Sequence, residues 1–187
     1  MEMTDFSSAL SKIVKFLENN NIQYMLIGGI ANSIYGEPRY TLDIEIKIKL
    51  NFGNEIKSFI SDISKEFTVI PENPYEFFKS TMVLPLESDG IKIDIVVAGL
   101  SFETDSLNRA VTKNFQNIAV KVCTAEDLII HKAISEREKD WLYIESIIKK
   151  RRQTLDWDFF IDTIKQLSEW LSDNEIYERI IRLKNEK

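Results

Sequence analysis

The pattern of hydrophobic and polar positions divides the chain into a mixed segment, residues 1–123, and a helical segment, residues 124–187. In the mixed segment, apolar side chains at helical spacing alternate with short runs that are typical of strands. The pattern predicts a helix, a strand, a helix, a strand and a helix, in that order, over residues 5–19, 24–27, 30–35, 42–50 and 54–67. Two glycines, Gly28 and Gly29, separate the first strand from the second helix.

A β-hairpin is predicted farther along the mixed segment. Residues 81–86 and 91–97 flank Ser88-Asp89-Gly90, a sequence typical of a tight turn. Pro85 has no backbone N–H, so we expect its strand to lie at an edge of the sheet. The remaining elements of this segment are a helix and a strand, near residues 102–111 and 115–122.

The helical segment opens with a clear capping sequence. Thr124 can cap a helix over residues 125–134, with Asp127 at its third position. We expect a break near residues 135–137, and Asp156 and Asp173 can cap two further helices. The order of elements predicts an α+β (mixed α/β) fold: a small mixed sheet with flanking helices, followed by a helical part packed on it.

Composition narrows the class of protein. The chain has 187 residues, of which 44% are hydrophobic and 29% charged, as in an ordinary globular domain. The net charge of -6 argues against a broadly basic nucleic-acid-binding protein. The single cysteine, Cys123, excludes an internal disulfide and fits a reducing cytosol. No stretch resembles a signal peptide or a membrane span, so we expect a cytoplasmic protein with no membrane partner.

Acidic side chains provide the candidate chemistry. Asp43 and Glu45 are two apart on the alternating strand, so they leave the same face with Cα atoms roughly 6.5 Å apart. Two carboxylates at this spacing can converge on hard divalent cations such as Mg²⁺. The alternative is a solvated strand face, because Lys47 and Lys49 continue the same side.

Two neighbouring features favour the metal-site hypothesis. Glycines such as Gly28 and Gly29 let a phosphate approach the backbone at a helix N-terminus, although they could simply make a tight turn. Asp94 lies in a strongly apolar strand, where an acid is costly to bury unless it is paired or bound to metal. Its alternative is an exposed position on a half-buried strand, since Lys92 shares its face.

These motifs carry a resemblance. The stretch MLIGGIANSIYGEPRYTLDIEIKIK resembles the signature of the nucleotidyltransferase superfamily: a strand ending in Gly-Gly, a helix, and a strand with Asp-x-Glu. The run from Gly36 to Asp43 is similar to the AbiEii-type toxin group of nucleotidyltransferases. The later residues Lys132, Arg137 and Asp140 resemble a helix pair in the same group.

The resemblance implies a role for each matching residue. Asp43 and Glu45 would bind Mg²⁺ or Mn²⁺, and Asp94 would be a third carboxylate that binds metal or deprotonates the attacking hydroxyl. The implied nucleotide-binding residues are Gly28, Gly29, Arg39, Thr41, Lys132 and Asp140. From the residues themselves, Arg39 could instead brace the strand, and Lys132 could be a solvated helix lysine. Glycine at position 29 and glutamate at position 45 depart from the commoner serine and aspartate.

The resemblance also implies an activity. The enzyme would move a nucleoside monophosphate from an NTP to a hydroxyl of an RNA end or a protein, as a toxin with an antitoxin partner or in phage defence. An antibiotic-modifying nucleotidyltransferase and a catalytically weak binding module remain alternatives. The basic run 149–152 closes a helix, where it could be solvated or bind RNA.

Overall fold

The computed structural model describes residues 3–38, 41–51, 53–135 and 137–186. The chain forms two compact units. The first comprises Met1–Ile30 and Tyr40–Cys123, and the second comprises Ala31–Arg39 and Thr124–Lys187. Helix α2 (Gly28–Tyr35) therefore begins in the first unit and ends in the second.

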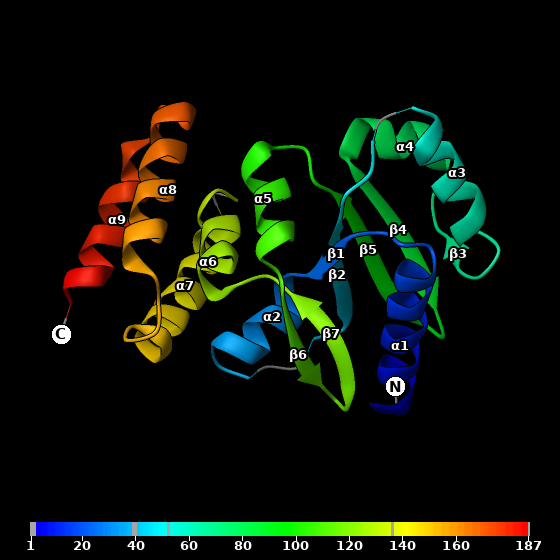
Figure 1. The fold of residues 1–187 in the computed structure, drawn as a ribbon, viewed down its shortest axis with the longest axis horizontal. Helices are drawn as coiled ribbons and strands as arrows, with labels where there is room; N and C mark the ends of the chain where they lie inside the picture. The colour runs from blue at the N-terminus through cyan, green and yellow to red at the C-terminus, as the bar shows by residue number, and fades with distance from the viewer. Residues whose placement is uncertain (1–2, 39–40, 52, 136, 187) are drawn as a thin grey trace. The chain divides into compact units, whose positions relative to one another are not determined.

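The described part of the first unit is built on a seven-stranded mixed sheet with the order β3-β4-β5-β2-β1-β7-β6 (Figure 1). Its strands are β1 (Tyr24–Leu26), β2 (Asp43–Ile48), β3 (Thr68–Val69), β4 (Val83–Ser88), β5 (Ile91–Val97), β6 (Val111–Phe115) and β7 (Ile118–Val122). Its helices besides the start of α2 are α1 (Met3–Asn19), α3 (Asn54–Ile63), α4 (Pro74–Thr81) and α5 (Ser101–Arg109). The predicted mixed α/β fold is confirmed.

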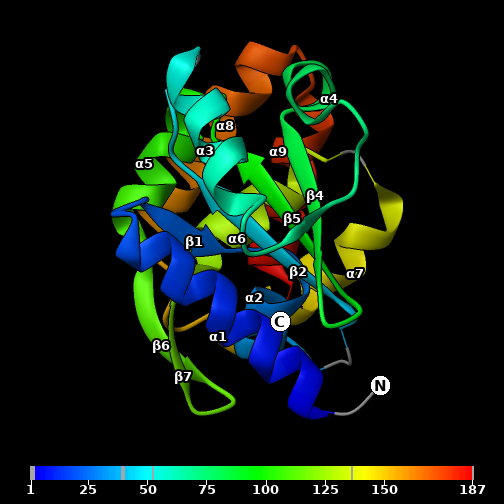
Figure 2. The same cartoon turned by 90° about the vertical axis from the view of Figure 1, so that its right-hand side faces the viewer.

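One face of the central sheet is apolar and forms the core. β2 and β5 bury their alternate residues completely: Ile44, Ile46, Ile48, Ile93 and Ile95. Helices α1 and α3 lie over the sheet in Figure 2 and join each other through the ring of Phe16, which meets Phe59 and Phe67 edge to face. Burial of each such side chain stabilises the folded state by about 1.5–3 kcal/mol. This burial fixes which residues must face the other way.

Both hairpins of the sheet turn through left-handed residues. Asp89 and Gly90 have φ of 54° and 75°, as expected for a two-residue turn that follows the strand twist. Gln116 and Asn117, with φ of 51° and 64°, make the equivalent turn between β6 and β7. The second hairpin was not predicted, because neither of its turn residues is glycine.

Two expectations for the region before β4 are wrong. The predicted strand start at Thr81 is the end of α4, a helix that Pro74 begins at its first turn. β4 is not an edge strand, because β3 pairs with it on the outer side. Pro85 is tolerated there since β3 ends at Val69, and its carbonyl accepts a hydrogen bond from Ile70 N–H (3.1 Å).

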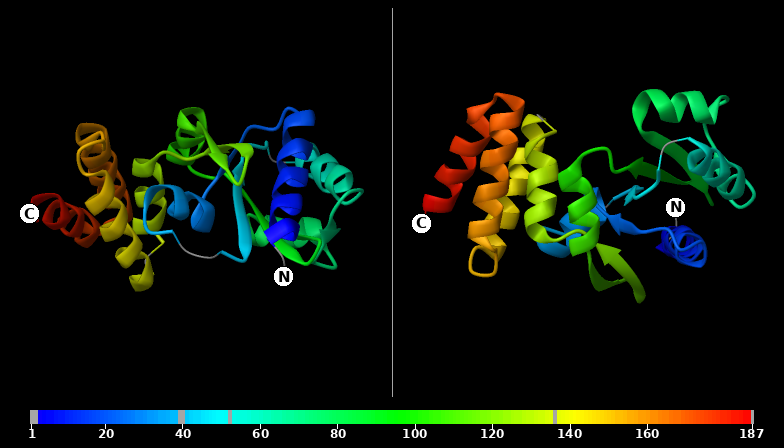
Figure 3. Two further views of the ribbon diagram at one scale, coloured as in Figure 1. Left: turned by 90° about the horizontal axis from the view of Figure 1, so that it is seen from below. Right: turned by 45° about the horizontal axis from the view of Figure 1, so that its top comes forward.

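The second unit is helical after Thr124. It contains α6 (Ala125–Ala133), α7 (Glu138–Arg151), α8 (Trp157–Leu171) and α9 (Asn174–Asn185). The predicted caps are confirmed, because Thr124, Asp156 and Asp173 each accept a backbone N–H with the side chain. Figure 3 shows α8 and α9 side by side. None of the helices in the described ranges combines the length and apolarity needed to cross a membrane.

The basic run at the end of α7 contacts helix ends within the second unit. Arg151 donates to the carbonyls of Ile34 (2.8 Å) and Tyr35 (3.3 Å), the last residues of α2. Arg152 donates to the carbonyl of Leu183 (2.7 Å) near the end of α9. Cations stabilise the carbonyl end of a helix, so these two arginines stabilise the ends of α2 and α9 and are not freely solvated.

A buried ion pair connects α6 to α7. Lys132 Nζ lies 3.1 Å from Asp140 Oδ1, and both residues are at least nine-tenths buried. Asp140 Oδ2 also accepts hydrogen bonds from Ser135 Oγ (2.9 Å) and Arg137 Nε (2.7 Å). Burial by itself raises the pKa of the Asp140 carboxyl, but Lys132, Ser135 and Arg137 together outweigh it and hold the pKa below its ordinary value.

We predict that Asp140→Asn lowers the free energy of unfolding at pH 7 by about 3 kcal/mol, because it leaves Lys132 buried without its counter-charge. Folding lowers the pKa of Asp140, so the stabilisation is complete above the ordinary value of 3.8 and disappears as the pH falls through the folded-state pKa. Urea unfolding of both proteins across pH 3–7 measures this difference.

The matched control is Asp62→Asn, which removes the acid of the exposed Lys65–Asp62 pair. Exposed pairs contribute about 0–1 kcal/mol, so this change should cost little at any pH. Equal stability losses for the two variants would contradict the structural role of Asp140.

Candidate active site

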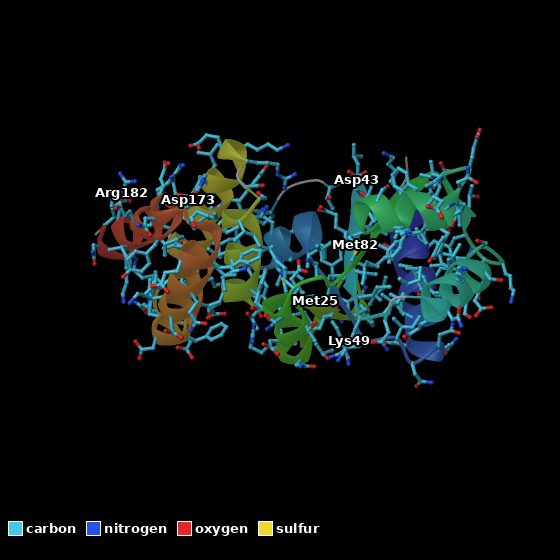
Figure 4. The ribbon with its side chains drawn as sticks, turned by 90° about the horizontal axis from the view of Figure 1, so that it is seen from above. Met25, Asp43, Lys49, Met82, Asp173 and Arg182 are labelled. Carbon is cyan, nitrogen blue, oxygen red and sulfur yellow. The ribbon has the colours of Figure 1, made fainter. Side chains whose placement is uncertain are left out.

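The face of the sheet opposite the core carries the acidic residues. β2 and β5 are parallel and pair in register, so that Glu45 lies directly beside Asp94. Neighbouring strands are about 4.8 Å apart, and side chains of register partners leave the same face. Asp43, two residues before Glu45, lies at the start of β2, whereas Lys49 follows its other end (Figure 4). The three predicted carboxylates are thus neighbours on one face.

Helix α5 covers the other end of this face. Buried Lys47 forms an ion pair with Glu103 of α5, and Ser106 Oγ lies 3.4 Å from Met25 Sδ. The hypothesis of a solvated strand face is therefore wrong for Lys47, while Lys49 is exposed. Because Lys47 is engaged by Glu103, it does not neutralise the acids at the open end of β2.

The glycine pair forms the first turn of α2, which begins at Gly28 and not at Ile30. Gly28 has φ of +57°, and a Cβ there would lie 1.6 Å from Glu45 Oε2. A Cβ on Gly29 would lie 2.3 Å from Thr41 Oγ1. A larger residue at Gly28 would be strained by the positive φ and would displace the carboxylate of Glu45, and one at Gly29 would displace Thr41 before β2.

The side chain of Glu45 connects β2 to this turn. Its Oε2 accepts a hydrogen bond from Gly29 N–H at 3.0 Å. A carboxylate at a helix N-terminus is stabilised by the unpaired amides and the helix dipole. The amide of Gly29 can therefore bind an anionic oxygen, and in this structure that oxygen is the carboxylate oxygen of Glu45.

Asp94 is half-buried on the same face. Burial raises the pKa of its carboxyl above the ordinary value; Lys92 opposes this rise and the nearby charge of Asp43 adds to it. A carboxylate with a raised pKa is a better proton acceptor than an exposed aspartate. The sequence suggested this environment, because Asp94 interrupts an apolar strand.

The donor chemistry of the three carboxylates fits a hard cation such as Mg²⁺, which prefers oxygen ligands. In the ranges that the structure describes, no three acidic, histidine or cysteine side chains are close enough together to hold a metal as they stand. The hydrogen bond from Gly29 turns the carboxylate of Glu45 toward α2. Joint coordination of one cation by Asp43, Glu45 and Asp94 therefore requires their side chains to move closer together.

The other predicted site residues do not all lie beside the three carboxylates. Thr41 Oγ1 donates to the carbonyl of Asp43 at 3.2 Å and packs against Gly29. Arg39 lies outside the described residues. Lys132 and Asp140 belong to the second unit, where they pair with each other.

Solved structures share this fold. The solution structure of the antibiotic-resistance factor ANT(2″)-Ia matches 90% of this chain and 96% of its own, with a TM-score of 0.59 and 14% identity. An antigenic nucleotidyltransferase-like protein from Paracoccidioides brasiliensis matches 96% and 94%, with a TM-score of 0.54 and 17% identity. The lincosamide antibiotic adenylyltransferase LnuA, bound to lincomycin, matches 74% and 93%, with a TM-score of 0.50 and 13% identity.

Sequence comparison is decisive for the family. A search of curated protein sequences gave no match. Residues 6–184 match the model of a family described as nucleotidyl transferase of unknown function (DUF2204). This match spans nearly the whole chain and includes the glycine turn and all three carboxylates, and the protein belongs to this nucleotidyl transferase family.

Proposed function

We propose that the protein is a metal-dependent nucleotidyltransferase that moves a nucleoside monophosphate from an NTP to a hydroxyl. The observation that carries the proposal is the cross-strand arrangement of Asp43, Glu45 and Asp94 next to the glycine turn at the start of α2. An acidic cluster beside a helix N-terminus combines cation ligands with an anion-binding amide, which are the two needs of a triphosphate.

In the proposed reaction, Gly29 N–H donates to a phosphate oxygen after the carboxylate of Glu45 has moved away. Asp94 accepts the proton of the attacking hydroxyl at a carboxylate oxygen. A bond forms between the hydroxyl oxygen and the α-phosphorus, and the bond from this phosphorus to the leaving pyrophosphate breaks. Divalent cations held by Asp43, Glu45 and Asp94 would neutralise the phosphate charge.

The acceptor is a separate question. The resemblance to the AbiEii-type toxins favours an RNA end or a protein, together with an antitoxin partner. The adenylyltransferases of the same fold include one that is bound to an antibiotic. An antibiotic-like small molecule is therefore the other acceptor class.

A second candidate function is a catalytically weak nucleotide- or partner-binding module. It is favoured by one observation: the carboxylate of Glu45 occupies the amide of Gly29 that a phosphate would need. A site closed permanently in this way could not bind a triphosphate through Gly29. The two candidates therefore differ in whether Glu45 moves when nucleotide and metal are added.

The first test concerns ligand binding. We expect Mg²⁺ or Mn²⁺ together with an NTP to raise the melting temperature more than either ligand alone, because the carboxylates and the triphosphate share the cations. Thermal melts with metal, with NTP and with both measure the effect. No shift under any of these conditions would count against an NTP site.

Replacing the acids should separate activity from stability. Asp43→Asn and Asp94→Asn should each lower label transfer from a radioactive NTP by at least about 100-fold, because each removes a carboxylate that would hold the divalent cations that neutralise the phosphate charge. Asp94→Asn should also raise the melting temperature of the ligand-free protein at pH 7. Folding raises the pKa of Asp94, so its charge costs stability at neutral pH, and this cost disappears as the pH falls toward 3.8.

Wild-type transfer in either variant would remove that residue from the active site. An unchanged or lower melting temperature for Asp94→Asn would show that the carboxylate is stabilised by a partner, as Asp140 is.

Substitutions of Glu45 discriminate between the enzyme and the binding module. Glu45→Gln should be nearly inactive, since an amide cannot balance the charge of divalent ions. Glu45→Asp should keep partial activity, because it retains a carboxylate at the same strand position. Transfer rates with Mg²⁺ and Mn²⁺ and nucleotide affinities measure both effects. Nucleotide binding without transfer, in the wild type and in Glu45→Asp alike, would favour the binding module.

A further inference from the structure

The face of the sheet that carries Asp43, Glu45 and Asp94 continues toward the outer strands. In β4, Leu84 and Leu86 point into the core, so Pro85 between them faces the polar side, and Pro85 is the register partner of Asp94. Ile70 follows β3 and donates its backbone N–H to the carbonyl of Pro85. A single row therefore crosses the sheet from Glu45 through Asp94 and Pro85 to Ile70.

A hollow with a volume of ≈ 480 Å³ lies at the outer end of this row. Its apolar walls come from the loop after β3, from α4 and from β4: Ile70, Pro71, Phe77 and Pro85. Ile70 and Phe77 are 46% and 39% exposed, and exposed apolar side chains gathered in one hollow are a feature of binding sites. Ligand pockets range over roughly 300–1,000 Å³, so the hollow is large enough for a small molecule.

The charge of the hollow restricts what it can bind. Glu72 and Glu76 are its ionisable lining residues, and none of the described residues that line it is basic. A phosphodiester chain would meet two like charges and no cation there. An apolar or aromatic body with an amine fits both the walls and the acidic rim.

The hollow lies on the side from which an acceptor hydroxyl would attack the phosphorus. In phosphoryl transfer, the attacking and leaving oxygens lie roughly in line on opposite sides of the phosphorus. The proposed function places the triphosphate at Gly29, on the β1 side of Glu45. The attacking hydroxyl then approaches Asp94 from the β4 side, away from Gly29. Pro85 and Ile70, which line the hollow, lie on that side.

We propose that this hollow binds the acceptor, and that the acceptor is a small amphipathic amine whose hydroxyl reaches Asp94. This inference rests on the proposed function, because it takes its direction from the nucleotide site. It differs from the sequence-based prediction of an RNA or protein acceptor.

The test uses three small probes and the full chain labelled at isoleucine methyl groups. Tyramine and 4-hydroxyphenylacetate share a phenol ring and differ in the sign of their charge, and uridine monophosphate represents an RNA end. We expect tyramine to shift the Ile70 methyl signal, which Ile70→Val identifies. Binding of 4-hydroxyphenylacetate should be about fivefold weaker, since an exposed ion pair contributes about that factor.

Two variants and a matched control locate the site. Phe77→Arg should abolish the tyramine-induced shift at Ile70, because it fills the hollow with a cation. Glu76→Lys, an exposed substitution that leaves the apolar walls intact, should reverse the preference between tyramine and 4-hydroxyphenylacetate. The control is Val111→Arg, since Val111 is 37% exposed on β6, at the other edge of the sheet.

The outcomes distinguish this inference from the proposed function. Absence of a tyramine shift at Ile70, a stronger shift with uridine monophosphate, or an unchanged charge preference in Glu76→Lys would each overturn the acceptor site. Metal-dependent stabilisation by NTP is measured on the same sample and tests the nucleotide site alone. If NTP with metal does not stabilise the protein but tyramine still shifts the Ile70 signal, the proposed function is refuted and the hollow remains a binding site for amines.

Discussion

The site depends on the parallel pairing of β2 with β5. β2 alternates isoleucine with charged residues throughout and β5 does so from Ile91 to Ile95, and burial of the isoleucines against the core fixes the register. A slip of one residue in either strand would turn its isoleucines to the opposite, polar face of the sheet, so the position of Glu45 beside Asp94 is held by the same free energy that stabilises the fold. The carboxylates need no dedicated scaffold, because the register of the core places them.

The glycine turn adds a second constraint to this pairing. Gly28 and Gly29 allow the start of α2 to approach β2 so closely that Glu45 reaches an amide N–H. An aspartate at position 45 is one methylene shorter and would reach less far toward that amide. The longer side chain of Glu45 therefore places a carboxylate at the N-terminus of α2, where it would compete with a phosphate for the amide of Gly29.

Much of the site could be predicted because it follows from local rules. Alternation placed Asp43 and Glu45 on one face, and the apolar context singled out Asp94. The pairing of Pro85 with Asp94 was missed, because Pro85 was expected at an edge of the sheet and strand order is a non-local property. Lys132 was ambiguous for a similar reason: its partner Asp140 lies one helix later, and a sequence does not show which face of each helix is buried.

Two aspartates that the fold removes from water, Asp140 and Asp94, have pKa values shifted in opposite directions. Asp140 is almost fully buried, yet its pKa is lowered, since a lysine, a serine and an arginine all favour its charged form. Asp94 is less buried, yet its pKa is raised, because burial and Asp43 outweigh the single opposing charge of Lys92. The first acid contributes stability and the second costs stability at neutral pH. In the function proposed above, divalent cations shared with a triphosphate would bind the charged form of Asp94 and offset this cost.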